Sequence, residues 1–182
     1  LLPGSRRQEL AKKLPLMLAA AAQFKDTHQI VVACAQAIPK AIYEGYCVHH
    51  DVFLSEAHTY DVLSKAELAL VTSGTATLET ALFGVPQVVC YKGSALSIWL
   101  ARKLVKIKYI SLVNLILDKS AVPELIQQDC TVENMQNALQ EILPGQKQRA
   151  EQLANYGQLQ GLLKQSGVSE RIAQSMNSYL AS

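Results

Sequence analysis

The residues best suited to chemistry follow a short apolar run near the middle of the chain. Residues 68–71 are all apolar and predict a buried strand, and the turn Ser73-Gly74-Thr75 then opens a helical pattern. A strand, a small-residue turn and a helix expose free N–H groups at the helix N-terminus, which favour anions such as phosphate. We therefore predict an anion site at Ser73, Gly74, Thr75 and Ala76, where the two hydroxyls donate hydrogen bonds and the glycine allows close approach.

Glu79 is the second candidate in this stretch. It lies one helical turn beyond Thr75, on the same face of the predicted helix. It does not complete a capping box, because the residue three positions before it is Ala76. We interpret Glu79 as an acceptor of hydrogen bonds from hydroxyl groups, such as those of a ribose. The alternative for the whole stretch is an ordinary capped helix that follows a strand.

The same arrangement occurs at the start of the chain. Residues 1–2 look like the tail of a strand, a turn with Gly4 and Ser5 follows, and the apolar spacing predicts a helix over residues 7–24. Arg6 at a helix N-terminus opposes the dipole, so it costs some stability unless an anion lies there. The alternative is a solvated arginine. The abrupt beginning leads us to expect further residues upstream in a longer protein.

The composition is that of a folded domain with a hydrophobic core. The chain has 182 residues, 49% of them hydrophobic and 18% charged, and its net charge of +2 gives no case for nucleic acid. The four cysteines form no C-x-x-C pair and lie at no zinc spacing from a histidine, so we predict no metal. Cys34 and Cys90 lie inside apolar runs, which predicts reduced core residues of a cytosolic protein. The longest apolar stretch is too short to span a bilayer, and we expect no signal peptide.

Apolar runs alternate with helical patterns before residue 118. This alternation predicts an α/β fold with a parallel sheet and right-handed crossovers. Ligands of such sheets bind at the carboxyl ends of strands, the edge on which the Gly4 and Gly74 turns are both expected. After residue 118 only helices are predicted. The predicted strands are 29–34, 48–54, 67–71 and 85–91, and the predicted helices are 37–44, 60–65, 122–128, 132–143, 146–165 and 169–180.

Two further features leave alternatives open. His49, His50 and His58 lie close in sequence and suit a metal or a general base, but solvated loop histidines are more common. Asn114 interrupts the apolar run 109–115, so its side chain is either a turn former or a contact to a ligand.

One segment is basic and amphipathic. No Asp or Glu occurs between residues 80 and 117, and a helical stripe of apolar residues runs beside Trp99. Such a segment can rest on an anionic membrane surface. The alternative is a packed helix with a solvated basic face. The basic residues are Lys92, Arg102, Lys103, Lys106 and Lys108, and the stripe is Leu96, Leu100, Leu104 and Ile107.

Three strings, in register, resemble the lipid-A-disaccharide synthase family of GT-B glycosyltransferases. They are residues 2–6 (LPGSR), 73–79 (SGTATLE) and 108–115 (KYISLVNL), and residues 99–106 (WLARKLVK) fit as well. The resemblance covers most of the chain and roughly the C-terminal half of that enzyme. Where the family usually reads Ser-Leu-Pro-Asn, Val113 replaces the proline, which loosens the turn but keeps Asn114.

The resemblance implies a fold and a reaction. The fold is an α/β, Rossmann-like parallel sheet with helices on both faces and a helical C-terminal tail. Residues 1–130 would bind a UDP-sugar, and the helices of 131–182 would pack on them or on a missing N-terminal half. The reaction is an inverting transfer of 2,3-diacylglucosamine from its UDP derivative to 2,3-diacylglucosamine 1-phosphate, which forms the β-1,6-linked lipid A disaccharide and releases UDP.

The resemblance also implies roles for individual residues. Arg6 would stabilise the departing diphosphate, Asn114 would assist catalysis, and backbone groups near Leu54 would hold uracil, with neither metal nor cofactor. The general base would come from the missing half, so this chain alone should bind UDP but hardly turn over. The implied substrate-binding residues are Gly4, Ser5, Arg6, Leu54, Ser73, Gly74, Thr75, Ala76, Glu79 and Asn114.

Lipid substrates imply a cellular location and binding partners for such an enzyme. We expect a cytoplasmic protein, peripheral on the inner membrane of a Gram-negative bacterium, with the anionic membrane surface and the missing half as partners. A homodimer is left open, and no nucleic acid is expected. Two other functions compete: a non-catalytic nucleotide-sugar-binding module, and a UDP-sugar epimerase of the same fold, for which only residues 49–58 offer acid or base groups.

Overall fold

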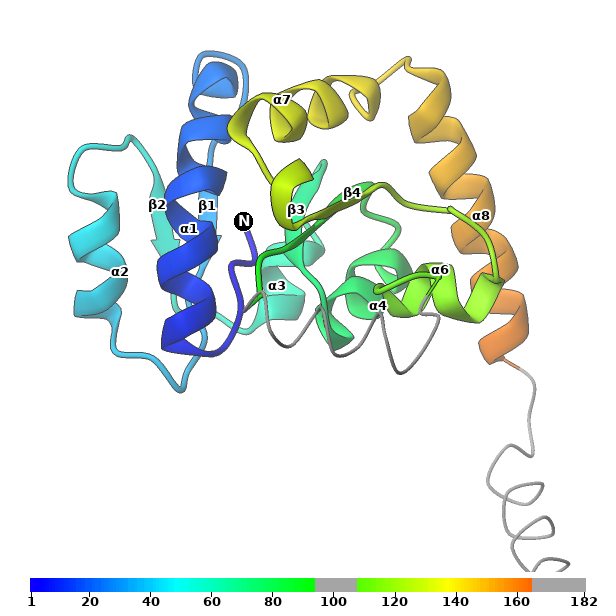
Figure 1. Cartoon of the computed structure of the whole chain (residues 1–182), viewed down its shortest axis with the longest axis horizontal. Coiled ribbons are helices and arrows are strands. Elements are labelled where there is room, and N and C mark those ends of the chain that lie inside the picture. Colours follow the sequence, from blue (N-terminus) through cyan, green and yellow to red (C-terminus); the bar gives the residue numbers. More distant parts are fainter. Residues whose placement is uncertain (94–107, 165–182) are drawn as a thin grey trace, which may run out of the picture.

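A parallel sheet forms the centre of the computed structural model, which describes residues 1–93 and 108–164 (Figure 1). Leu1 and Leu2 join its two groups of strands: Leu1 O accepts a hydrogen bond from Ala33 N at 3.0 Å, and Leu2 N donates to Leu70 O at 2.9 Å. The spatial order is therefore β2, β1, residues 1–2, β3, β4, β5, the order of a doubly wound nucleotide-binding sheet. The strands are β1 (Val31–Ala33), β2 (Phe53–Ser55), β3 (Ala69–Thr72), β4 (Gln87–Tyr91) and β5 (Glu124–Ile126).

Helices cover both faces of this sheet (Figure 1). On one face α1 packs against α2 and α7, and on the other face α4 packs against α6 and α8. Helix α3 contacts β1. This arrangement confirms the predicted α/β fold with helices on both faces and a helical C-terminal part. The helices are α1 (Arg7–Ala21), η1 (Ala22–Phe24), α2 (Lys40–Cys47), α3 (Thr59–Leu63), α4 (Thr75–Leu82), α6 (Leu112–Leu117), η2 (Gln127–Asp129), α7 (Val132–Glu141) and α8 (Lys147–Leu163).

Alternating side chains of the central strands divide the core in two. Leu70 of β3 packs with Met17 of α1 and Met135 of α7, whereas Val89 of β4 packs with Tyr156 of α8 on the opposite face. All five side chains are buried. The four cysteines are buried and free, which confirms the core position predicted for two of them.

Most predicted elements are present, with ends shifted by a few residues. The Thr131 hydroxyl caps α7 by accepting a hydrogen bond from Asn134 N at 3.2 Å. α8 starts directly after the predicted break at Gly145. The helix predicted over 169–180 lies outside the described residues, and the proposed domain boundary at residue 130 stays a prediction.

One predicted helix is wrong, and one predicted strand begins later than expected. The helix predicted over 122–128 is replaced by strand β5 and the start of η2. Leu125 of β5 pairs with Cys90 of β4, and Val89 N donates to Pro123 O at 2.9 Å. Pairing along β4 outweighs the helix propensity of this Glu- and Gln-rich stretch. The strand predicted from residue 48 begins only at Phe53, because α2 continues to Cys47 and Val48 is 71% exposed.

Candidate functional site

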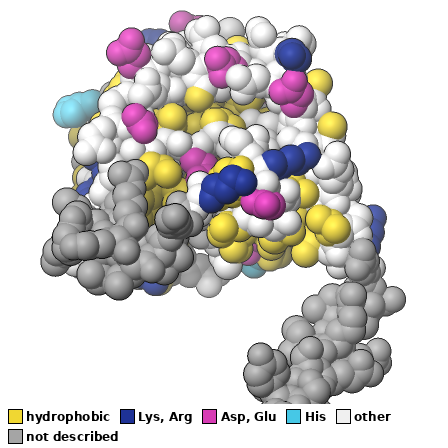
Figure 2. Space-filling model, turned by 45° about the vertical axis from the view of Figure 1, so that its right-hand side comes forward, with side chains coloured by type: hydrophobic (Ala, Val, Ile, Leu, Met, Phe, Trp, Pro, Cys, Tyr) yellow, Lys and Arg dark blue, Asp and Glu magenta, His cyan; other side chains and the backbone are white. Residues whose placement is uncertain are grey.

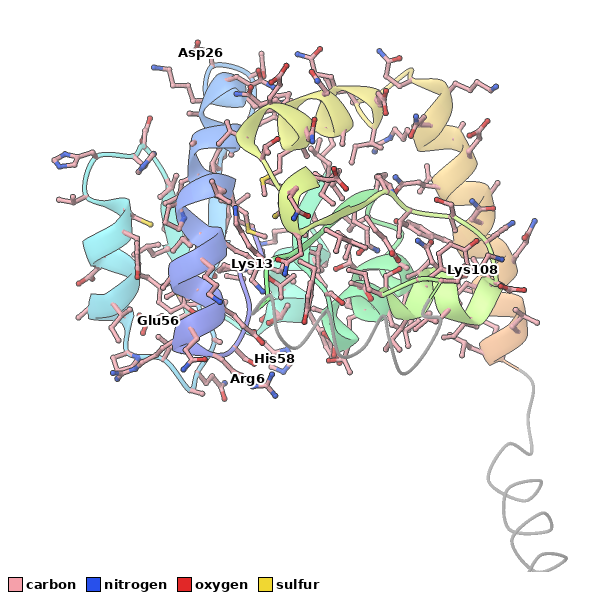
Figure 3. The ribbon with its side chains drawn as sticks, viewed as in Figure 1. Arg6, Lys13, Asp26, Glu56, His58 and Lys108 are labelled. Atoms are coloured by element: carbon pink, nitrogen blue, oxygen red, sulfur yellow. The ribbon has the colours of Figure 1, made fainter. Side chains whose placement is uncertain are left out.

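The two predicted turns meet at the carboxyl end of the sheet, where the strand order reverses. Leu2 pairs with Val71, so the Gly4 turn lies beside the end of β3. A Cβ atom on Gly4 would lie 3.4 Å from Thr72 Cγ2. Figure 3 shows Arg6 at this same end of the molecule. Doubly wound sheets bind their ligands at this place, so both turns can face one ligand.

The N-terminus of α4 offers backbone donors. Gly74 has φ 151°, and a Cβ there would meet no described atom within 4 Å, so the turn is open to a ligand. No side chain among the described residues caps α4. The N–H groups of Thr75 and Ala76 open the helix and have no partner within it. An anion at this turn would therefore receive two backbone hydrogen bonds.

The Ser73 hydroxyl faces inward rather than to the ligand side. It donates a hydrogen bond to Ile110 O at 2.9 Å, so its proton is used within the protein. The predicted role of Ser73 as a donor to the ligand stays a prediction. The bond ties the turn before α4 to the segment before α6.

Arg6 stands at the N-cap of α1 with a largely free side chain. The side chain is 82% exposed, and its Nη1 lies 3.1 Å from Glu9 Oε1. The sequence suggests that Arg6 needs a bound anion, but in the structure the Glu9 carboxylate of the same chain already serves as that anion. Because an ion pair this exposed contributes little, Arg6 can exchange Glu9 for a ligand.

Glu79 lies against an aromatic cluster that the sequence analysis missed. Tyr60 Oη lies 3.5 Å from Glu79 Oε1, and the Tyr60 ring lies 5.3 Å from the Phe83 ring and 4.6 Å from the His58 ring. Phe83 follows Glu79 by one helical turn, which is the sequence signal for that half of the cluster. The carboxylate can accept hydrogen bonds from a ligand beside these rings.

Asn114 is fully buried, and every polar atom of its side chain has a partner. Its Oδ1 accepts hydrogen bonds from Ala121 N at 2.8 Å and Val122 N at 2.9 Å. Its Nδ2 donates to Val122 O at 2.9 Å and to Glu124 Oε1 at 2.8 Å. Of the two alternatives for Asn114, this geometry favours the turn former. A catalytic role for Asn114 is not tested and stays a prediction.

A buried lysine lies on the α1 side of the sheet. Lys13 is only 2% exposed, and burial lowers its pKa, while the nearby Glu9 carboxylate and the Cys90 and Cys130 thiols act in the opposite direction. The neighbouring Cys90 side chain lowers the pKa of Cys130, whereas burial acts in the opposite direction. Lys13 was not among the predicted site residues, although its place three residues after Leu10 puts it in the apolar stripe of α1.

Strand β2 carries the predicted uracil contact, which stays a prediction, and separates the histidines. The backbone beside Leu54 is engaged in the sheet, since Phe53 N donates to Ile30 O at 2.8 Å. His58 follows β2, whereas His49 and His50 precede it, so the three lie at opposite ends of that strand. The described residues contain no group of His, Cys, Asp or Glu side chains that could hold a metal.

The basic segment is described only at its ends. Lys108 Nζ lies 3.1 Å from Asp118 Oδ1. Acidic and basic side chains are interspersed over the described surface of the face in Figure 2. No helix of the described residues is long and apolar enough to cross a membrane. The predicted stripe and Trp99, Arg102, Lys103 and Lys106 lie outside the described residues.

Comparison with known proteins shows to which family the chain belongs. A family model described as lipid-A-disaccharide synthetase matches residues 1–177. The chain belongs to this family. Similar members include the lipid-A-disaccharide synthases of Anaeromyxobacter dehalogenans, 38% identical over 96% of the chain, and Rhodospirillum centenum, 35% identical over 96%. That of Gloeothece citriformis is 33% identical over 99% of the chain.

The chain spans about half the length of these curated relatives: 47%, 46% and 49% of the three proteins. Family membership thus agrees with the resemblance that the three sequence strings carry. The described residues of those strings gather at the carboxyl edge of the sheet, where Ser73 contacts Ile110 and Leu2 pairs with Val71.

Proposed function

We propose that this chain is the donor-nucleotide half of a lipid-A-disaccharide synthase. It would hold UDP-2,3-diacylglucosamine while the sugar passes, with inversion, to 2,3-diacylglucosamine 1-phosphate and UDP leaves. The observation that carries the proposal is the meeting of two glycine turns and two helix N-termini at the strand-order reversal, in a chain of this family. Arg6 and the helix N-termini supply the positive potential, so no metal or cofactor is invoked.

The electrostatics suit a departing diphosphate. UDP gathers negative charge as the glycosidic bond breaks, and fixed donors stabilise that charge more strongly in the transition state than in the ground state. We assign this role to the N–H groups of Thr75 and Ala76 and to the Arg6 guanidinium. The general base would come from the part of the relatives that this chain does not span. We therefore expect UDP binding without appreciable turnover by this chain alone.

Glu79 gives the nucleoside test of the proposal. Glu79→Gln is expected to weaken UDP roughly tenfold, because a charged acceptor for the ribose hydroxyls is lost, and to leave pyrophosphate affinity unchanged. Calorimetric titration with both ligands measures the difference. Glu133→Gln, an exposed carboxylate on α7, is the matched control and should bind both ligands normally. Equal losses for UDP and pyrophosphate in Glu79→Gln would make Glu79 structural.

The competing functions have less support. A UDP-sugar epimerase needs paired acid and base groups near the donor sugar, and the histidines that could provide them lie at opposite ends of β2. A non-catalytic module would share the UDP site, but the family membership favours a transferase.

We infer peripheral contact with the inner membrane through the basic segment, because both proposed substrates are lipids. Each lysine near an anionic surface contributes about 1 kcal/mol, and salt screens this attraction. Sedimentation with anionic vesicles should show binding that decreases with added salt and with joint replacement of Lys103, Lys106 and Lys108 by Gln. Replacing Lys12, Lys25 and Lys147, which lie outside the segment, by Gln is the control of equal charge. If the first triple variant sediments like the unmodified chain, the three lysines do not contribute to membrane binding and are only exposed to solvent.

A further inference from the structure

One peptide group is held from both sides at the edge of the site. Ser111 N–H donates to Glu124 Oε1 at 2.9 Å. The carbonyl of that same peptide group, Ile110 O, accepts the Ser73 hydroxyl at 2.9 Å. The Ile110–Ser111 peptide therefore links a carboxylate on β5 to the first residue of the turn before α4.

Glu124 binds this segment through several donors. Ile110 N donates to its Oε2 at 3.0 Å, and Asn114 Nδ2 donates to its Oε1 at 2.8 Å. A charged acceptor forms stronger hydrogen bonds than a neutral one, and it polarises the peptide so that the carbonyl accepts more strongly on its other side. The bond from Ser73 to Ile110 is strengthened in this way. Ser73 N also donates to Cys90 O at 3.2 Å, so hydroxyl and backbone hold the residue from two directions.

We propose that Glu124 is a positioning residue for the nucleotide site. It fixes the Ile110–Ser111 peptide, and through that peptide it fixes the Ser73 hydroxyl and the N–H groups of Thr75 and Ala76. Glu124 acts without touching the ligand. The inference rests on the proposed function only in that the ligand is taken to be UDP.

UDP titration of the whole chain tests the coupling. Glu124→Gln keeps the shape but presents an amide to backbone donors, and Ser73→Ala removes the bond on the other side of the peptide. Each substitution is expected to weaken UDP binding about tenfold. The double variant should bind UDP no more weakly than the worse single variant, because both substitutions break the same linkage. Glu141→Gln, an exposed carboxylate on α7, is the matched control and should bind normally. Additive losses, or normal UDP binding by Glu124→Gln, would overturn the inference.

Hydrogen exchange without ligand separates this inference from the proposed function. Amides of residues 73–78 should exchange faster in Glu124→Gln and in Ser73→Ala, and at the normal rate in Glu141→Gln and in Ser73→Thr, which keeps the hydroxyl. Faster exchange in a chain that does not bind UDP would support the positioning role and refute the proposed function. Faster exchange confined to residues 110–114 would overturn the positioning role. If Glu124→Gln fails to fold, the Ser73→Ala and Ser73→Thr pair still tests the bond to Ile110 on which the linkage depends, and equal exchange at residues 73–78 in these two variants would overturn the inference.

Discussion

Arg6→Ala is expected to weaken UDP binding roughly tenfold to a hundredfold and to leave uridine affinity unchanged. The reason is that hydrogen bonds to charged groups are worth about 1.5–3 kcal/mol, and only UDP carries the diphosphate. The substitution also leaves the Glu9 carboxylate, which lies 3.1 Å from Arg6 Nη1, without its cation beside the ligand. In the complete enzyme the loss of transition-state stabilisation should be about 2–4 kcal/mol. Titration with UDP and with uridine measures the binding effect.

The neighbouring arginine provides the control for Arg6. Arg7 is also exposed, and Arg7→Ala removes the same charge one residue further along the chain. We expect near-normal UDP affinity for Arg7→Ala, because long-range attraction alone is screened by salt. Equal losses of UDP affinity in both variants would mean that Arg6 contributes only its positive charge and makes no specific contact with UDP. Normal UDP affinity in Arg6→Ala would remove Arg6 from the site.

The second large effect is on stability. Asn114→Ala should lower the free energy of unfolding by about 3–4 kcal/mol, because buried donors and acceptors lose their partners. The groups left unpaired include the Ala121 and Val122 N–H groups, which now donate at 2.8 and 2.9 Å. Chemical denaturation followed by circular dichroism measures the change.

An exposed asparagine on α7 provides the comparison. Asn137→Ala makes the same replacement at the surface and should change the free energy of unfolding by no more than about 0.5 kcal/mol. If Asn114→Ala is as stable as Asn137→Ala, the buried network contributes little. Asn114 would then be free to act on the ligand, as the catalytic prediction requires.

Local patterns were sufficient for the parts of the fold that depend on nearby residues. The apolar run 68–71 followed by Ser73, Gly74 and Thr75 correctly placed β3, the turn and α4. The Gly4 turn was equally clear, since a strand tail, a glycine and an apolar helical stripe follow in order. Their meeting at one edge also followed from the sequence, because a parallel sheet puts every strand end of one kind on the same side.

Contacts between distant residues were beyond the reach of those patterns. β5 was mistaken for a helix because its pairing with β4 depends on a strand far back in the chain. Nothing near Ser73 indicates that Ile110 takes its proton, and nothing near Asn114 indicates that Glu124 completes its hydrogen bonds. Tyr60 reaches Glu79 only because α3 and α4 lie on the same face of the sheet. Residue types thus indicated a candidate site, whereas the contacts of the folded chain show which of its described side chains already have partners within the protein.

Direct titration of the 182-residue chain with UDP tests the central claim, that the carboxyl edge binds a uridine diphosphate. TDP and ADP provide the controls, since they carry the same diphosphate on other nucleosides. We expect saturable binding of one UDP per chain, because Glu79 and the two turns would hold the ribose and the diphosphate. UDP should bind more tightly than TDP or ADP, on the prediction that backbone groups near Leu54 hold uracil. Failure of the folded chain to bind UDP, or equal affinity for all three nucleotides, would contradict a uridine-specific donor site.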